Sequence, residues 1–313
     1  MPEAPTLPAN FLEPGLDGPL GRFKGAKPPS PAWFHRALAI EPERGFVEVD
    51  GARIETRVWG EVGKPGLLLC HGNSAHADWW SFVAPFFAND WRVAAFSWSG
   101  MGASDWRATY DMDIYSREAM AVAEHLGLFE AGPPVFVAHS FAAGPVMTAA
   151  AQWGERLRCA IIVDNGARTE EQPLYLRRRS RPNAVYPTVT AALARYRLPG
   201  DPPDNLFLLD YCGRIAIVPA PDGEGWTWAF DPFSAEKRGF DHIYSLGRII
   251  PEARCPLSFI WGDRSHLVGP EVLANTRAAA PPGTRFLEIP DSSHYIMIDQ
   301  PLALVAAIKG LLA

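Results

Sequence analysis

The stretch V-F-V-A-H-S-F-A-A-G at residues 135–144 decides the fold prediction for the whole chain. Its apolar first half predicts a buried strand, and the small apolar residues after Ser140 predict the start of a helix. A serine on a tight strand-to-helix turn has an exposed hydroxyl, as a nucleophile elbow requires. The residues two before and two after it must be small, and here they are Ala138 and Ala142 rather than glycines. The alternative interpretation is an ordinary serine at a helix N-cap.

Two other segments favour a nucleophile over a cap. The tripeptide H-G-N at 71–73 follows the apolar run G-L-L-L-C, and its glycine lets the Asn73 N–H point toward Ser140. Together with the Phe141 N–H, it would form a two-donor oxyanion hole. His294 follows the apolar run T-R-F-L-E-I and precedes the last helical pattern, so a general base there could fold back over the serine.

From residue 46 onward, short apolar runs alternate with helical patterns. Strands are expected at 46–50, 53–59, 66–71, 92–98, 134–139, 158–164, 256–261 and 284–289. Helices are expected at 79–88, 113–127 and 141–153, and from about 270 and 301. Runs that are apolar on both faces indicate a covered parallel sheet built from right-handed strand–helix–strand units. The first two runs alternate around Asp50-Gly51, which predicts an antiparallel hairpin at the sheet edge.

The long interruption of this pattern predicts an inserted lobe. We expect a cap lobe at 166–250 between the core segments 46–165 and 251–313, because structureless loops of that length are rare in compact domains. Residues 1–45 hold nine of the 30 prolines, which predicts an extended arm with one short helix near 31–40. The lobe holds eleven aromatic residues, which favour an apolar or aromatic substrate group. Alternatively, these aromatic residues attach the lobe to the core.

Composition narrows the functional classes. A net charge of -6 argues against a nucleic-acid-binding surface, and no apolar run approaches the ~20 residues of a membrane span. The first ten residues lack the basic and apolar regions of a secretory signal. The four cysteines form no C-x-x-C pair, which indicates reduced, mostly buried thiols and no zinc site. We therefore expect a cytoplasmic protein that acts on a small molecule and needs no metal or organic cofactor.

On these motifs the chain resembles the α/β-hydrolase superfamily from about residue 46 to the C-terminus. The motifs are H-G-N at 71–73, S-G-M-G-A-S-D at 99–105, A-H-S-F-A at 138–142, W-G-D-R-S-H-L-V at 261–268 and D-S-S-H at 291–294. The resemblance implies a mostly parallel α/β sheet of about eight strands with helices on both faces, and the order Ser140, acid, His294. A dinucleotide-binding interpretation of Gly100 and Gly102 fails, because Asp105 occupies the third glycine position.

The resemblance also identifies a departure at the catalytic acid. Many family members carry this acid in a G-x-x-D turn after the seventh strand, and that register places Ser265 at the acid position. Asp164, at the end of the sixth strand, matches the acid of some haloalkane dehalogenases and is our first choice. Asp263, on the strand-seven loop, is the alternative acid. Asp291, three residues before His294, is a weaker third candidate.

We therefore expect a serine hydrolase that cleaves a carboxylic ester or a related acyl substrate. Ser140 would attack the carbonyl, His294 would act as general base, and Asp164 would hold the imidazole. Haloalkane dehalogenases and epoxide hydrolases use an aspartate nucleophile, which Ser140 replaces. Carbon–carbon bond hydrolases and cofactor-free perhydrolases use a serine and stay open as alternatives. A non-catalytic ligand-binding protein also stays open, with Ser265 as its best support.

Overall fold

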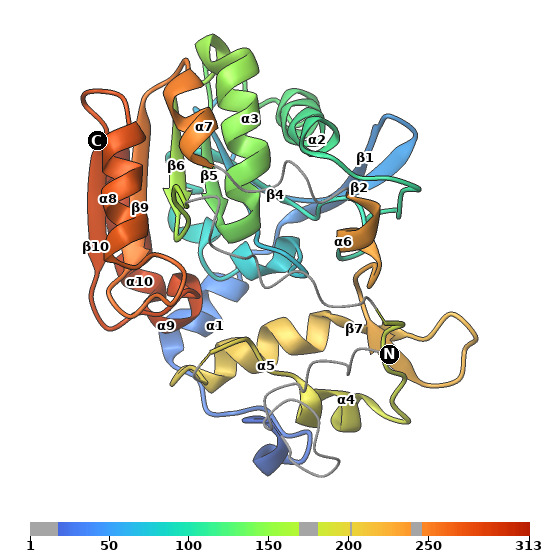
Figure 1. Cartoon of the computed structure of the whole chain (residues 1–313). Helices are drawn as coiled ribbons and strands as arrows, with labels where there is room; N and C mark the ends of the chain where they lie inside the picture. The colour runs from blue at the N-terminus through green and yellow to red at the C-terminus, as the bar shows by residue number, and fades with distance from the viewer. Residues whose placement is uncertain (1–17, 169–180, 201, 239–245) are drawn as a thin grey trace, which may run out of the picture. The chain divides into compact units, whose positions relative to one another are not determined.

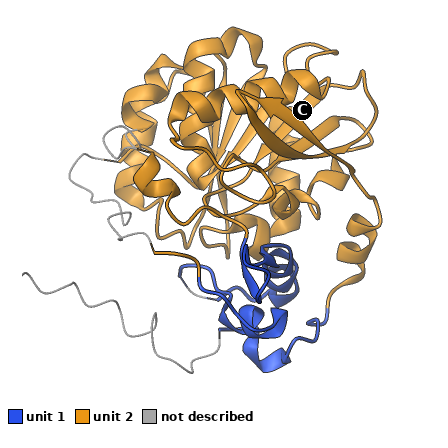
Figure 2. Cartoon of the chain, turned by 90° about the vertical axis from the view of Figure 1, so that its right-hand side faces the viewer, with its two compact units in different colours: residues 1–29, 184–228 blue, residues 30–183, 229–313 orange. Residues whose placement is uncertain are grey.

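The computed structural model describes residues 18–168, 181–200, 202–238 and 246–313 (Figure 1). The chain forms two compact units, shown in Figure 2. We call one the lobe unit, whose described residues are 18–29, 184–200 and 202–228, and the other the sheet unit, which comprises the described residues of 30–183 and 229–313.

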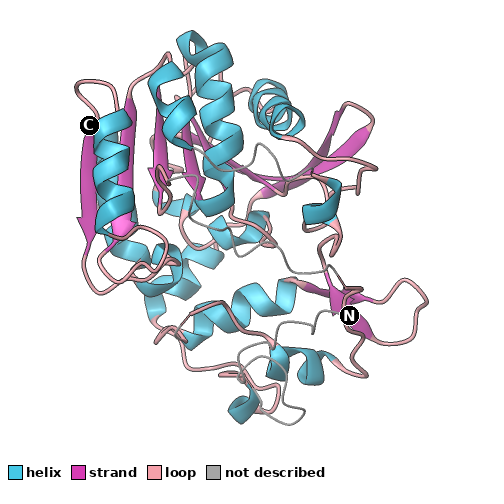
Figure 3. Cartoon of the chain, viewed as in Figure 1, coloured by secondary structure: helices cyan, strands magenta, loops and turns pink. Residues whose placement is uncertain are grey.

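A mostly parallel sheet of eight strands forms the centre of the sheet unit in its described residues (Figure 3). The strands are β1 (Glu43–Val49), β2 (Ala52–Trp59), β3 (Gly66–Cys70), β4 (Arg92–Phe96), β5 (Val135–His139), β6 (Cys159–Val163), β9 (Leu257–Gly262) and β10 (Arg285–Ile289). Their order is β1-β2-β4-β3-β5-β6-β9-β10. β1 and β2 form an antiparallel hairpin at one edge, β2 is antiparallel to β4, and the remaining neighbours are parallel. The sheet confirms the predicted fold class and its edge hairpin.

The central strands are fully buried because their sequences are apolar on both faces. Every residue of β3, β5 and β6 is buried, which is typical of parallel strands covered on both sides. The carboxyl ends of these strands meet at one edge of the sheet, where polar residues follow them.

Helices cover both faces of this sheet. The helices of the sheet unit, in its described residues, are α1 (Ala32–Leu38), α2 (Met112–His125), α3 (Ala143–Trp153), α6 (Ser234–Lys237), α7 (Leu246–Ile249), α8 (Pro270–Ala279), α9 (Ile296–Asp299) and α10 (Pro301–Leu312). α2, α3, α7 and α8 contact one another in that order and form one layer. In the other layer, α1 packs on the 3-10 helix η4 (Ala84–Phe86), and Lys309 of α10 lies over the ring of Phe87. No helix in the described part of the chain is long and apolar enough to cross a bilayer, and the cytoplasmic location stays a prediction.

The predicted helix at 79–88 is wrong. The chain forms two short 3-10 helices there, η3 (Ala77–Trp80) and η4, instead of one α-helix. Pro85 explains the difference, because it lacks the backbone N–H that a continuing α-helix needs at that position. The other predicted helices of the sheet unit are confirmed, including the short one near 31–40, which is α1.

The lobe unit has a small core of its own. Its elements are the 3-10 helix η2 (Gly21–Phe23), α4 (Val189–Arg195), α5 (Leu206–Ile215) and the hairpin of β7 (Ile217–Pro219) with β8 (Trp226–Trp228). The Gly18 N–H donates to the Ala194 carbonyl at 2.5 Å, and Arg214 Nη2 donates to the Gly25 carbonyl at 2.8 Å. Residues from the expected N-terminal arm therefore fold together with residues from the expected lobe. The cap boundaries at 166 and 250 stay a prediction.

Candidate active site

Ser140 and Asp164 directly follow neighbouring parallel strands, β5 and β6. His139 pairs with Val163 in the sheet register, so the two polar residues come next at the same edge. Both adopt left-handed backbone conformations, with φ of 54° at Ser140 and 53° at Asp164. Such a conformation costs a non-glycine residue on the order of 1–3 kcal/mol, and the surrounding structure must enforce it.

Hydrogen bonds enforce both turns. Asn165 Nδ2 donates to the Ser140 carbonyl at 2.8 Å, so the residue after Asp164 holds the serine turn. The Asp164 N–H donates to the Ile260 carbonyl of β9 at 2.8 Å. The two strained residues are therefore fixed to each other and to the next strand.

His294 links the two turns. Its Nε2 lies 2.8 Å from Ser140 Oγ, and its Nδ1 lies 2.6 Å from Asp164 Oδ2. Asp164 and His294 are buried, while Ser140 is half-buried. A carboxylate accepts hydrogen bonds only, so Nδ1 carries the proton and Nε2 is left to accept one from the serine hydroxyl. This arrangement is chemically suited to activate Ser140 as a nucleophile.

The Asp164 carboxylate accepts two further hydrogen bonds from the segment around β9. The Gly262 N–H donates to Oδ1 at 3.1 Å, and Ser265 Oγ donates to Oδ2 at 2.6 Å. The Ser265 oxygen itself accepts from the N–H groups of Leu267 and Val268, each at 3.1 Å. Since its lone pairs are engaged, the Ser265 hydroxyl proton is directed at the carboxylate.

The other two candidate acids have different contacts. Asp263 is exposed, and its Oδ1 accepts from the Ser292 N–H at 3.1 Å. Desolvation acts to raise the pKa of Asp263, but hydrogen bonds from the backbone of Ser292 and Asp291 outweigh it, and the pKa is lowered. Asp291 is exposed, and its carbonyl accepts from Gln300 at 3.4 Å. Of the three acids, Asp164 is the one hydrogen-bonded to His294 in the described part of the chain.

The H-G-N segment lies against Ser140. A Cβ added to Gly72 would stand 2.9 Å from His139 Nδ1 and 3.2 Å from Ser140 Cβ, so glycine is required at this close approach. His71 Nδ1 donates to the Gly72 carbonyl at 2.7 Å. In a trans peptide the following N–H, that of Asn73, points opposite to this carbonyl. The His71 ring therefore fixes the direction of the Asn73 N–H.

The buried rings of His71 and His139 have lowered pKa values and stay neutral. Burial lowers the pKa of His71 to about 3, and its Nε2 accepts from the Trp98 N–H at 3.2 Å. Burial, together with the nearby His294, holds the pKa of His139 well below its usual range. His139 Nε2 lies 3.0 Å from the His294 carbonyl, and the two ring centroids lie 4.8 Å apart. His139 thus anchors the backbone of the residue that contacts Ser140.

Comparison with known proteins identifies the family. Residues 67–308, most of the chain, match the model of the Alpha/beta hydrolase family. The chain belongs to this family. No curated protein matches the sequence.

Solved structures with the same fold include three hydrolases. The α/β-hydrolase superposes on E-2-(acetamidomethylene)succinate hydrolase with a TM-score of 0.76 at 20% identity, covering 87% of this chain and 99% of that one. The thioesterase domain from the curacin biosynthetic pathway superposes with a TM-score of 0.71 at 21% identity, covering 86% of this chain and 99% of that one. An esterase from M. tuberculosis superposes with a TM-score of 0.64 at 18% identity, covering 93% of this chain and 95% of that one. At these identities the likeness establishes the fold alone.

Arg238 is a neighbour of the site that the sequence did not indicate. It follows α6, and its Nη2 donates to Oδ1 of Asn73 at 3.1 Å. Its guanidinium lies 4.8 Å from the centroid of the Phe141 ring. No motif marks this arginine among the others of the α/β-hydrolase sequence, because its burial depends on packing.

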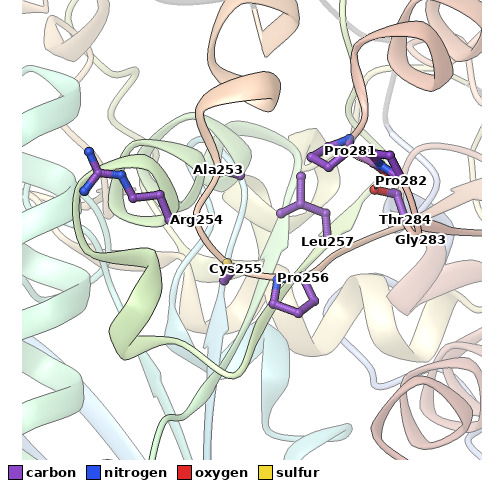
Figure 4. A pocket seen from close by; sticks show the side chains of 9 residues that line it. All are labelled: Ala253, Arg254, Cys255, Pro256, Leu257, Pro281, Pro282, Gly283 and Thr284. Atoms are coloured by element: carbon purple, nitrogen blue, oxygen red, sulfur yellow. Dashed lines mark hydrogen bonds between the residues drawn. The ribbon is translucent and has the colours of Figure 1, made fainter.

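A separate pocket lies at the opposite end of β9. Figure 4 shows its lining residues, 253–257 and 281–284, which lie at the amino ends of β9 and β10. Its volume is about 480 Å³. Because the site residues follow the carboxyl ends of the strands, this pocket at the amino ends is not part of the candidate active site.

Proposed function

We propose that this α/β-hydrolase is a serine hydrolase that cleaves a carboxylic ester or a related acyl substrate. The observation that carries the proposal is the hydrogen-bonded series of Ser140, His294 and Asp164, with contacts of 2.8 and 2.6 Å. A serine hydroxyl is a weak nucleophile unless a base removes its proton, and a base needs a third group to hold its tautomer.

Acylation begins when Ser140 Oγ attacks the substrate carbonyl carbon and its proton passes to His294 Nε2. The carbonyl electron pair moves onto oxygen, and the Asn73 and Phe141 N–H groups donate to this oxyanion. Asp164 stabilises the imidazolium through Nδ1–H. As the tetrahedral intermediate collapses, the leaving alcohol takes the proton from Nε2 and an acyl-serine ester remains.

Deacylation repeats these steps with water. His294 Nε2 takes a proton as the water oxygen attacks the acyl carbon, and the same two N–H groups stabilise the second oxyanion. When the bond to Ser140 Oγ breaks, Nε2 returns the proton to the serine. The products are a carboxylic acid and the free enzyme.

The neutral state of His71 supports the proposed oxyanion hole. Because Nδ1 donates to the Gly72 carbonyl, it keeps that carbonyl turned away and leaves the Asn73 N–H to donate elsewhere. The close approach of Gly72 to Ser140 supports a position of this N–H beside the nucleophile. Preorganised donors of this kind typically contribute 10²–10³ in kcat each.

The contacts of Asp164 also bear on the non-catalytic alternative. That alternative drew its support from Ser265 at the usual acid position. The hydrogen bond between Asp164 and His294 supplies a carboxylate for the imidazole from another strand and therefore favours an enzyme. Carbon–carbon bond hydrolases use the same three residue types, and the substrate panel below separates them from esterases.

Labelling with a fluorophosphonate probe tests the proposal. Wild-type protein should be labelled stoichiometrically at Ser140, and folded Ser140→Ala protein should remain unlabelled. A panel of p-nitrophenyl esters, lactones and aromatic diketones then identifies the bond that is cleaved. Absence of labelling in folded wild-type protein would instead identify a ligand-binding protein.

A further inference from the structure

Arg238 is a buried cation, and none of its hydrogen-bond partners within residues 18–168, 181–200, 202–238 and 246–313 is a carboxylate. Only 5% of the surface of this residue is exposed to solvent. Nε donates to the Ser234 carbonyl at 3.2 Å and Nη2 donates to Asn73. Buried Nη1 has no hydrogen-bond partner in the part of the chain that the structure describes. A guanidinium keeps its charge at all working pH values, and burying an unpaired charge is costly.

Other shielded arginines of the sheet unit have carboxylate partners. Arg57 pairs with both Glu55 and Asp78, and Arg107 pairs with Glu118 at 2.9 Å. Among the described residues, no such ion pair involves Arg238. Comparable charges are therefore neutralised by internal ion pairs, whereas the described residues supply no such pair for Arg238.

Arg238 lies beside the two residues that are proposed to stabilise the oxyanion. Its guanidinium contacts the side chain of Asn73 and lies over the ring of Phe141. These two residues supply both proposed oxyanion donors, and Phe141 is joined to Ser140 in sequence. An anion bound at Nη1 would thus lie beside the acyl group that Ser140 attacks.

We propose that Arg238 binds a carboxylate of the substrate, so that the enzyme hydrolyses esters of acidic acyl chains. This substrate class rests on the proposed serine hydrolase function. Nη1 would supply the donor to the carboxylate, while Asn73 Oδ1 and the Ser234 carbonyl hold the guanidinium in place. The remainder of the substrate stays free to be apolar.

Matched methyl esters test the assignment. The monomethyl esters of succinate, glutarate and adipate carry a free carboxylate, and their dimethyl esters are neutral and nearly isosteric. We expect wild-type kcat/KM to be about 10- to 100-fold higher for at least one monoester than for its diester. This comparison needs no variant. An equal or lower value for all three monoesters would overturn the proposal.

Variants then assign the preference to Arg238. Arg238→Gln should lower the ratio of monoester to diester kcat/KM by about 10-fold or more, and Arg238→Lys should retain part of it. Arg254→Gln is the matched control, because Arg254 lies at the opposite end of β9 with an exposed side chain, and it should keep the wild-type ratio. An equal loss with both ester classes would place Arg238 on the common oxyanion and overturn the proposal.

A binding measurement separates this proposal from the proposed function. Glutarate should slow fluorophosphonate labelling of Ser140 in wild type, whereas neutral glutaramide should not. The protection should disappear in folded Arg238→Gln protein. Labelling without protection by glutarate overturns the substrate class and leaves the serine hydrolase intact, while failure of labelling itself contradicts the serine hydrolase.

Discussion

The Ser265 hydroxyl donates to Asp164 Oδ2, the same oxygen that lies 2.6 Å from His294 Nδ1. Ser265 stands where many related enzymes carry the acid. In this chain the residue at that position still contacts the acid, as a hydrogen-bond donor to the Asp164 carboxylate in the turn after the neighbouring strand β6. The serine therefore orients an acid that the chain supplies from β6.

Loss of Ser140 or His294 should abolish most turnover without unfolding the protein. Members of a triad act as a unit, so Ser140→Ala and His294→Ala should each lower kcat by about 10³-fold or more. Ester hydrolysis and thermal unfolding measure the two properties. His125→Ala, at an exposed position of α2, is the control and should keep wild-type turnover. Near wild-type activity in folded Ser140→Ala protein would refute the nucleophile.

Two aspartate variants test the acid. Asp164→Asn should lower kcat by about 10²- to 10⁴-fold, because the amide lacks the charge that stabilises the imidazolium and supports the wrong tautomer. Asp263→Asn should cost much less, since Asp263 is exposed and contacts the Ser292 backbone. Both variants are to be assayed on one ester. The reverse ranking would move the acid to the loop after β9.

Changes at Ser265 test its supporting role. Ser265→Ala removes a hydrogen bond to a charged group and should lower kcat by about 10-fold. Ser265→Asp should be more harmful, because it places a second carboxylate beside Asp164.

The double variant provides the sharpest form of this test. In the Asp164→Asn background, Ser265→Asp restores an acid at the usual family position. We expect the double variant to be at least about 10-fold more active than Asp164→Asn alone, a gain estimated from the strength of charge-assisted hydrogen bonds. No gain in a folded double variant would show that position 265 does not reach the imidazole productively.

The buried histidines should make stability fall at acidic pH. The pKa of His71 is lowered to about 3 in the fold, whereas an unfolded histidine titrates near 6.5. The contribution of neutral His71 to the free energy of unfolding is therefore fully present above about pH 6.5. It decreases as the pH falls toward 3, because the unfolded chain gains the proton first. Between these two pKa values, the free energy of unfolding falls by about 1.4 kcal/mol per pH unit for such a group. Urea unfolding at pH 7 and pH 5 measures it.

A variant pair isolates the contribution of His71 to that slope. His71→Asn should reduce the difference in unfolding free energy between the two pH values, whereas His125→Asn should leave it unchanged because His125 is exposed. An unaltered pH dependence of the unfolding free energy in His71→Asn would mean that His71 gains its proton over the same pH range in the folded and the unfolded chain.

The proximity of Ser140 and His294 was predictable because local patterns mark both residues. Each follows an apolar strand in a chain that alternates strands and helices, and parallel strands present their carboxyl ends at one edge. Asp164 was harder to choose, because its contact depends on β6 lying between β5 and β9 in the sheet. Sequence order alone does not specify that neighbour relation, and the preference for Asp164 came from a family resemblance.

Features that depend on packing escaped the sequence analysis. The α-helix expected at 79–88 does not form, because Pro85 lacks the backbone N–H that the helix would need there, and this outweighs the helical pattern of apolar residues around it. No sequence pattern pointed to Arg238, since its burial depends on the residue after α6 packing against Asn73 of the H-G-N segment. The absence of a carboxylate partner among the described residues is likewise a feature of the folded chain. The Ser265 contact also needed the structure, because its partner is 101 residues away in the sequence.

The separation of the site residues along the chain has a consequence during synthesis. Asp164 precedes His294 by 130 residues, and at about 5–20 residues per second this interval lasts roughly 6.5–26 s. Throughout that time a nascent chain on the ribosome carries Ser140 and Asp164 without the imidazole that joins them. We expect it to be inert toward esters in its surroundings, and to become reactive only when the segment after β10 has folded back onto the sheet.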